Sequence, residues 1–486
     1  MTTNNRIKQD ADYIFHELTR SICPECKAVI DAQVIIRDNK VYMRKRCPKH
    51  GWFEGIISSD AEMYIGSIRF NKPGTIPLDF STEVENGCPL DCGLCPEHKQ
   101  HICLALIEVN TACNLNCPVC FANAGAGYSL TLEQVEFMLD RFVEIEGDPE
   151  VVQFSGGEPA IHPQLPEMIQ AAKDRGIRQV MINTNGVRLA RDDRFLAQMQ
   201  ALDPVVYFQF DGLREETYLT IRGEPLLDTK MRALDRLAEA GMTAVLVAAI
   251  ERDVNTDEVG AILEFGLKHP AVLGVVFQPV THVGRHIEFD PMTRVTIPDI
   301  IHGIVDQTDG RFVLEDFVPV PCCFPTCQVN SYLFVDGDKV TPLPRLLDMD
   351  QYLDYITNRA LPKAPDAADI QAALEGLWSA SAVAGTEQTA GQFECACGPG
   401  LDLPYEINHL KEHVFQIAIK DFLDAWTFNV KQVMKCCVGI LTPDGRAIPF
   451  CAYNSVGYRE QIREQLTMEQ GRQKILSLSR TGEASA

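Results

Sequence analysis

The chain has 486 residues, which exceeds what one compact core accommodates, so roughly two to four domains are expected. Its 46% hydrophobic and 23% charged residues are typical of a soluble globular protein, and its longest apolar run, Ala244–Ile250, is far shorter than the roughly 20 residues of a membrane span. The formal net charge of −23 argues against a nucleic-acid partner and against a basic patch on an anionic membrane, but it leaves open a peripheral contact with lipid.

The first 20 residues are polar and lack the apolar segment of a secretion signal, so a cytoplasmic location is expected. The chain contains 18 cysteines, and nearly all of them fall in short-spaced groups. In a cytoplasmic protein, such groups indicate metal ligands rather than disulfides.

Residues 1–66 are interpreted as a ribbon-like module. A short polar helix is expected over about the first 20 residues, and Val34–Met43 is predicted to form two strands around an Asp38-Asn39 turn. This hairpin would bring together four ligands for zinc or a single iron, namely Cys23, Cys26, Cys47 and His50. A surface hairpin with unused thiols is the alternative.

Residues 67–103 carry a C-x3-C-x2-C motif followed by one more cysteine. We interpret these four residues as ligands of a first auxiliary four-iron cluster: Cys88, Cys92, Cys95 and Cys103.

A second C-x3-C-x2-C motif, formed by Cys113, Cys117 and Cys120, comes directly after an apolar stretch at 104–109. Three thiolates on one loop can hold three corners of a four-iron cluster and leave the fourth iron without a protein ligand. A zinc knuckle is the alternative, but it would need a fourth ligand nearby.

Residues 104–290 alternate strands and helices, which indicates a parallel sheet covered by helices. The expected strands are Ala105–Asn110, Val151–Ser155, Gln179–Thr184, Val205–Asp211, Thr243–Ile250 and Gly274–Pro279. The Thr131-Leu-Glu-Gln134 capping box predicts the start of the first intervening helix.

Residues 291–486 are interpreted as a C-terminal domain for a second auxiliary cluster. One hairpin over Tyr332–Val340 follows a cysteine group, and another lies between Cys437 and Cys451. Four cysteines are favoured as ligands, namely Cys323, Cys327, Cys437 and Cys451, with Cys322 and Cys436 as substitutes. A structural zinc site is the alternative, a buried helix is expected over Leu410–Phe428, and Cys395 and Cys397 are left unassigned.

The central motif resembles the signature of the radical S-adenosylmethionine (radical SAM) superfamily, and Phe121 matches the aromatic residue that commonly follows the third cysteine. The resemblance implies a partial (βα)6 barrel in which the open iron binds SAM. It favours Cys113, Cys117 and Cys120 as the radical-generating ligands, although two SAM-cleaving clusters side by side remain the alternative. The residues that this resemblance places near SAM are Gly156, Gly157, Glu158, Pro159, Thr184 and Asn185. Gln209 and Asp211, at a strand end, are candidates for the ribose hydroxyls, although Asp211 could equally cap the following turn.

The order of the cysteine groups resembles one radical SAM subgroup, which includes archaeal tetraether lipid synthase and proteins assigned as pterin C-methylases. That resemblance implies SAM, three four-iron clusters and one mononuclear iron or zinc. We expect a C–C bond-forming enzyme that acts on a lipid alkyl chain and receives electrons from a reductant such as ferredoxin or flavodoxin. The alternatives are C-methylation of a pterin or another small heterocycle, and a non-catalytic electron-transfer protein. The oligomeric state is not indicated.

Overall fold

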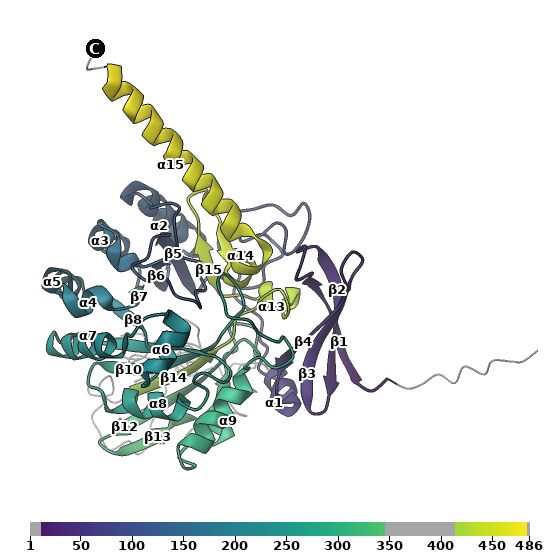
Figure 1. Ribbon diagram of the computed structural model, residues 1–486. Coiled ribbons are helices and arrows are strands. Elements are labelled where there is room, and N and C mark those ends of the chain that lie inside the picture. Colours follow the sequence, from purple (N-terminus) through teal and green to yellow (C-terminus); the bar gives the residue numbers. More distant parts are fainter. Residues whose placement is uncertain (1–10, 346–413, 484–486) are drawn as a thin grey trace, which may run out of the picture.

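The structure is a computed structural model that describes residues 11–345 and 414–483. Its strands form two sheets, one with four strands and one with twelve. Figure 1 shows the small sheet beside the barrel-like body, from which the C-terminal helix α15 extends.

The N-terminal module is a four-stranded antiparallel sheet, followed by helix α1 (Ala61–Ile68). Its strands are β1 (Ile14–Ile22), β2 (Val29–Arg37), β3 (Lys40–Cys47) and β4 (Gly51–Ser58). The predicted turn between β2 and β3 is confirmed, and both Asp38 and Asn39 have positive φ. The helix expected over the first 20 residues is wrong for 14–20, because this segment pairs along β2 and gains a ladder of hydrogen bonds.

The six predicted central strands are confirmed and lie parallel in chain order. They are β5 (Leu104–Asn110), β6 (Val151–Gly156), β7 (Gln179–Thr184), β8 (Val205–Gln209), β9 (Ala244–Ile250) and β10 (Val272–Pro279). The helices outside them are α2 (Leu132–Glu146), α3 (Leu165–Asp174), α4 (Val187–Arg191), α5 (Asp193–Leu202), α6 (Glu215–Arg222), α7 (Leu227–Glu239), α8 (Val259–Lys268) and α9 (Ile297–Gln307). The Thr131–Gln134 capping box begins α2 as predicted.

Segments from the C-terminal half extend this sheet at both edges. The two predicted hairpins are confirmed as β12 (Gln328–Asp336) with β13 (Lys339–Pro342), and β15 (Val438–Leu441) with β16 (Ala447–Pro449). The other elements are β11 (Val318–Pro319), β14 (Val414–Lys420), α13 (Val430–Val433), α14 (Phe450–Val456) and α15 (Tyr458–Glu483). Strand β14 is parallel to β10, and β15 is parallel to β5.

The helix expected over Leu410–Phe428 is wrong, because 414–420 form strand β14 between β10 and β12. All seven residues of this strand are buried. A strand covered on both faces has a continuous apolar pattern, which periodicity does not separate from that of a buried helix.

The barrel interior has an apolar layer near the strand starts. Its buried core consists of Val151, Met181, Val245, Val276 and Ala418. These residues lie on β6, β7, β9, β10 and β14, and their packing closes that part of the interior. The space above them, toward the strand ends, is where the polar motifs lie.

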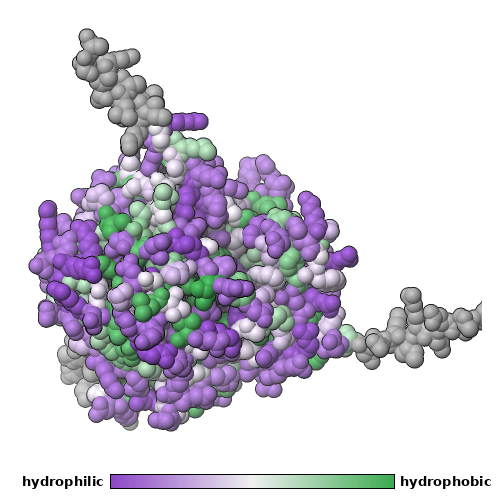
Figure 2. Space-filling model, viewed as in Figure 1, coloured by the Kyte–Doolittle hydropathy of each residue, from purple (hydrophilic) through white to green (hydrophobic). Residues whose placement is uncertain are grey.

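Hydrophilic side chains cover most of the face shown in Figure 2, with smaller hydrophobic patches between them. Within the described residues, we find no helix that combines the length and the apolar character of a membrane span.

Candidate active site and metal centres

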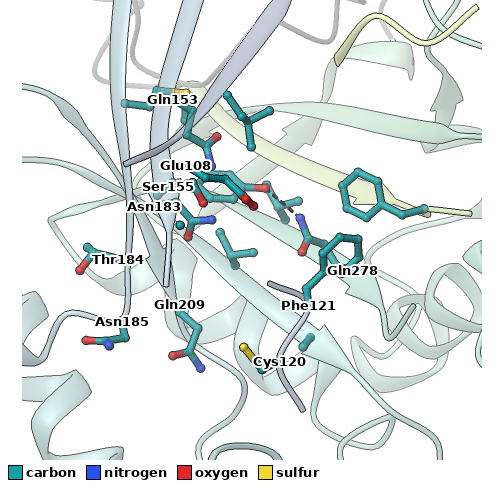
Figure 3. Close-up of a pocket in the computed structure, with 18 of the residues that line it drawn as sticks. Glu108, Cys120, Phe121, Gln153, Ser155, Asn183, Thr184, Asn185, Gln209 and Gln278 are labelled. Atoms are coloured by element: carbon teal, nitrogen blue, oxygen red, sulfur yellow. Dashed lines mark hydrogen bonds between the residues drawn. The ribbon is translucent and has the colours of Figure 1, made fainter. Parts of the chain in front are cut away.

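Cys113, Cys117 and Cys120 lie on the loop after β5 and line a cavity of about 290 Å³ inside the barrel. Figure 3 shows Cys120 and Phe121 among the residues that line this cavity, together with polar side chains of the strands. The backbone N–H of Leu115 lies 3.4 Å from the sulfur of Cys113, and that of Ala124 lies 3.3 Å from the sulfur of Cys120. Such N–H groups stabilise thiolates, so the loop suits a bound four-iron cluster.

Burial raises the pKa of Cys113 to about 11 and also raises the pKa of Cys117. Thiols with these values ionise when a metal binds them. Among the described residues that line the cavity there is no fourth cysteine and no histidine. The loop therefore offers three ligands, and a four-iron cluster held by them would have one iron without a protein ligand.

The glycines after β6 pack directly on the base of this loop. A Cβ atom on Gly156 would lie 2.3 Å from the carbonyl oxygen of Asn110, and one on Gly157 would lie 2.2 Å from that of Ala112. The N–H of Gly157 donates to Asn110, and the N–H of Glu158 donates to Ala112. Because glycine has no side chain, the cysteine loop can pack directly against both positions at the end of β6.

Glu158 holds two neighbouring strand ends together. Its carboxylate accepts hydrogen bonds from Thr184 Oγ1 at 2.7 Å, from the N–H of Asn185 at 2.7 Å and from the N–H of Ala160 at 2.9 Å. Burial raises the pKa of Glu158, although these donors oppose that effect. Glu158, Thr184 and Asn185 line the cavity, whereas Pro159 begins a 3₁₀ turn and is not among the lining residues.

Asp211 does not line the cavity. It is fully buried, and its carboxylate forms two hydrogen bonds of 2.7 Å with the guanidinium of Arg222. Arg222 also donates to the carbonyl of Val119, within the cysteine loop. Asp211 thus holds Arg222, which supports the cysteine loop. The expected contact with the ribose hydroxyls remains a prediction for Gln209, which lines the cavity.

Gln209 lines the cavity and is held by a buried lysine. Lys230 Nζ donates to Gln209 Oε1 at 2.8 Å and to the carbonyl of Asn185 at 2.7 Å. Burial lowers the pKa of Lys230 to about 7. The lysine connects the ends of β7 and β8, and so fixes the positions of two lining residues.

The cavity walls carry many uncharged polar side chains, which Figure 3 shows on neighbouring strands. This set includes Gln153, Ser155, Asn183, Gln209, Gln278, Gln328 and Gln416. Within the described part of the chain, the side chains of Gln153 and Asn183 make no hydrogen bond to protein. Their amides can therefore bind a ligand in the cavity.

The ribbon module assembles the predicted four ligands. Nδ1 of His50 lies 3.5 Å from the sulfur atoms of both Cys23 and Cys47, and the sulfur atoms of Cys26 and Cys47 are 3.9 Å apart. All four ligand atoms lie within 4.8 Å of one another. This arrangement fits one tetrahedral ion, whether zinc or iron.

The first auxiliary set is only partly assembled as expected. Cys88, Cys92 and Cys95 line one void together with Glu97. Cys103 lies elsewhere, and its sulfur is within 4.8 Å of those of Cys322 and Cys437. The predicted grouping of Cys103 with the preceding motif is therefore corrected, because the residue lies at the start of β5 beside β15.

The two C-terminal hairpins bring their cysteines together, as expected. One void is lined by Cys323, Cys327, Cys436, Cys437 and Cys451. Lys420 and Lys435 line the same void. Burial disfavours the charge of Lys420, but the nearby thiolates of Cys327 and Cys323 raise its pKa well above the usual value. Cys395 and Cys397 lie outside the described residues.

Known protein families match the two expected modules. The radical SAM superfamily profile matches residues 107–266, and the profile of the HMPTM N-terminal zinc ribbon domain matches residues 15–59. A protein of Methanocaldococcus jannaschii, named 7,8-dihydro-6-hydroxymethylpterin dimethyltransferase, is 34% identical across 93% of this chain and 95% of its own length. The chain belongs to the radical SAM superfamily. The predicted α/β radical SAM fold with an N-terminal ribbon is thereby confirmed.

Other radical SAM relatives match a smaller part of the chain. The GTP 3′,8-cyclase of Chlorobaculum tepidum is 33% identical over 34% of this chain, and the match spans 49% of the cyclase. The crystal structure of Streptococcus suis SuiB bound to S-adenosylmethionine aligns with a TM-score of 0.37 and 15% identity, over 43% of this chain and 47% of SuiB.

Sequence reasoning missed the charged residues that support the radical SAM site. Besides Arg222 and Lys230, Arg459 pairs with Glu108 at 2.7 Å, and the hydroxyl of Tyr453 donates to Glu108 at 3.0 Å. Lys230 lies on the buried face of α7 beside Ala233 and Leu234. A lysine on an otherwise apolar helix face could have indicated a buried charge with a specific partner.

We expect Gly157→Ala to lower the rate of 5′-deoxyadenosine formation by about 100-fold, because the cysteine loop must shift by about 1 Å to accept the new methyl group. The measurement is anaerobic turnover of SAM with dithionite, at matched iron content. Gly125→Ala is the control, since its Cβ meets no atom within 4 Å. Equal rates for the two variants would contradict the role given to this close contact.

Proposed function

We propose that this radical SAM enzyme forms C–C bonds by methylating a pterin or a closely related heterocycle. The observation that carries the proposal is the relative from M. jannaschii, which is named a dihydropterin dimethyltransferase and aligns over nearly the whole of both chains. The alignment covers 93% of this chain, so the likeness is not confined to the barrel.

The cavity supports a compact, polar substrate. The amides of Gln153 and Asn183 offer both donors and acceptors, which suit the edge of a pterin ring. The apolar floor closes the interior below them. Phe121 lies against Phe450, with ring centroids 5.2 Å apart, and both residues line the cavity. This wall suits the face of an aromatic ring and excludes water.

When a four-iron cluster and SAM are bound, one electron would cleave SAM into methionine and a 5′-deoxyadenosyl radical, which takes a hydrogen atom from a substrate carbon. A second SAM would supply the methyl group and, with a second electron from the reductant, leave as S-adenosylhomocysteine. The residues of the chain hold the reactants in place. Cys113, Cys117 and Cys120 would hold the cluster, and the backbone of Gly156 and Gly157 lines the space beside it. The amides on β6 and β7 would orient the substrate carbon toward the radical.

The auxiliary voids support two further clusters, which store or relay electrons. In the first void, a four-iron cluster would take Cys88, Cys92 and Cys95, and Glu97 as the fourth ligand. Glu97 Oε2 is buried and has no hydrogen-bond partner in the described structure. In the second void, the ligands would come from the five cysteines of the two hairpins. A ferredoxin or flavodoxin is proposed as the reductant.

The heterocycle replaces the lipid alkyl chain expected from the sequence, because both the relative's name and the amide-lined walls favour it. The experiment is anaerobic turnover of SAM with two deuterated candidates, a 6-hydroxymethyl-dihydropterin and an isoprenoid lipid. We expect deuterium in 5′-deoxyadenosine, and added methyl groups in the product, only with the pterin. Transfer from the lipid alone would overturn the proposal.

Gln153→Leu provides a matched variant for this experiment. The substitution removes an amide that binds no protein group, so the fold and SAM cleavage should remain. Deuterium transfer should fall by at least about tenfold, because a site that hydrogen-bonds its substrate loses affinity when one partner is removed.

A further inference from the structure

A second set of three close sulfur atoms includes that of Cys437, which also lines the second auxiliary void. The sulfur atoms of Cys103, Cys322 and Cys437 all lie within 4.8 Å of one another, as do the four ligand atoms of the ribbon site. We propose that these three cysteines, together with His101, hold a second mononuclear ion, which their ligand chemistry identifies as zinc. The inference concerns metal content and is independent of the substrate.

The separation of the sulfur atoms favours one ion over a cluster. With Zn–S bonds of about 2.3 Å and tetrahedral angles, ligand sulfurs lie about 3.8 Å apart. The ribbon site has this spacing, with 3.9 Å between the sulfurs of Cys26 and Cys47. In a four-iron cluster each thiolate binds a different iron, so the sulfur atoms lie further apart than around one ion.

His101 supplies the fourth ligand and already has the partner that a metal-binding histidine needs. Its Nε2 lies 3.4 Å from the sulfur of Cys103, close to the 3.5 Å between nitrogen and sulfur in the ribbon site. Its Nδ1 lies 2.8 Å from a carboxylate oxygen of Glu146. The other oxygen of Glu146 accepts the N–H of Ile102 at 2.8 Å. A carboxylate on the second ring nitrogen orients histidine ligands in zinc sites.

The imidazole does not yet lie within 4.8 Å of all three sulfur atoms, so its ring or a thiol must rotate as the ion binds. The surroundings fit a structural ion. Leu104 pairs with Val438, and each directly follows one of the cysteines. The N–H of Leu104 donates to the carbonyl of Cys437 at 3.2 Å. An ion here would join the start of β5 to β15 and to the segment before β12.

The proposal also divides the two Cys-Cys pairs. Cys322 and Cys437 would bind zinc, which leaves four cysteines for the second auxiliary cluster: Cys323, Cys327, Cys436 and Cys451. All four line one void, which Cys437 lines as well, whereas Cys103 and Cys322 do not. Adjacent side chains diverge, so one cysteine of each pair can face each centre.

The test measures metals in the anaerobically purified holoenzyme that carries Cys23→Ser and Cys26→Ser, which removes the ribbon ion. We expect one zinc per chain, with three sulfurs and one nitrogen around it by X-ray absorption. His101→Ala should remove this zinc and leave iron and sulfide unchanged. Glu146→Gln, which keeps the shape of the side chain, should weaken zinc binding by about 10- to 100-fold.

Two results would overturn the site. The first is a zinc content that stays the same in the His101 variant. The second is that Cys103→Ser loses the iron and sulfide of one four-iron cluster, since Cys103 would then be a ligand of that cluster. His302→Ala, on an exposed face of α9, is the control and should leave all metals in place.

Discussion

Cys117→Ala should reduce the formation of 5′-deoxyadenosine from SAM to background. Cys117 is one of three cysteines that line the barrel cavity, and the described lining residues include no other cysteine to replace it. A cluster held by two thiolates would be lost or misplaced, and without it SAM receives no electron. The measurement is 5′-deoxyadenosine per chain after anaerobic incubation with SAM and dithionite.

Cys26→Ser tests whether this loss is specific. Cys26 belongs to the four-residue group of the ribbon module that could hold one ion, and it does not line the cavity. Its replacement should therefore weaken metal binding in the ribbon and preserve SAM cleavage. A Cys117 variant that retains activity would contradict the assignment of the cluster. An equal loss of activity in the Cys26 variant, measured when the barrel cluster has its full iron content, would also contradict this assignment.

Arg222→Met should destabilise the protein by about 3–5 kcal/mol, because it leaves the carboxylate of Asp211 buried without its partner. Asp211 is fully buried, and the side chain of Arg222 is only 13% exposed. The arginine also donates to the carbonyl of Val119, so the cysteine loop should loosen and lose iron. The measurements are the apparent melting temperature and the rate of iron release.

Two further variants separate charge from geometry at this pair. Arg222→Lys keeps the charge but loses the two-bond contact, so its loss of stability should be intermediate. The double variant Arg222→Met with Asp211→Asn removes both charges and should regain most of the lost stability. If the double variant is no more stable than Arg222→Met, the unpaired charge is not the cause.

Local sequence patterns predict much of this molecule. Cysteine spacing located the loop at 113–120, and its position after an apolar stretch separated it from the similar motif at 88–95. The hairpin around Asp38 and Asn39 predicted the ribbon site, because the turn and the ligand spacing agree. These features depend on residues that are near one another in sequence.

Features that depend on distant contacts were not predicted. Val414–Lys420 is buried on both faces, so its pattern does not distinguish a strand from a helix. Cys103 follows Cys95 closely in sequence, yet it meets Cys322 and Cys437 because β15 pairs with β5. The ion pair between Asp211, in the loop after β8, and Arg222, at the end of α6, was likewise not predicted, because it depends on how that loop folds.

The central claim is that one iron of the barrel cluster is free to bind SAM. Electron–nuclear double resonance of the reduced enzyme, with SAM labelled by ¹⁷O in its carboxylate or ¹⁵N in its amino group, tests this directly. The account predicts hyperfine coupling of both labels to the cluster, and its absence in Cys117→Ala. Wild-type enzyme with an intact cluster and no coupling to either label would contradict it.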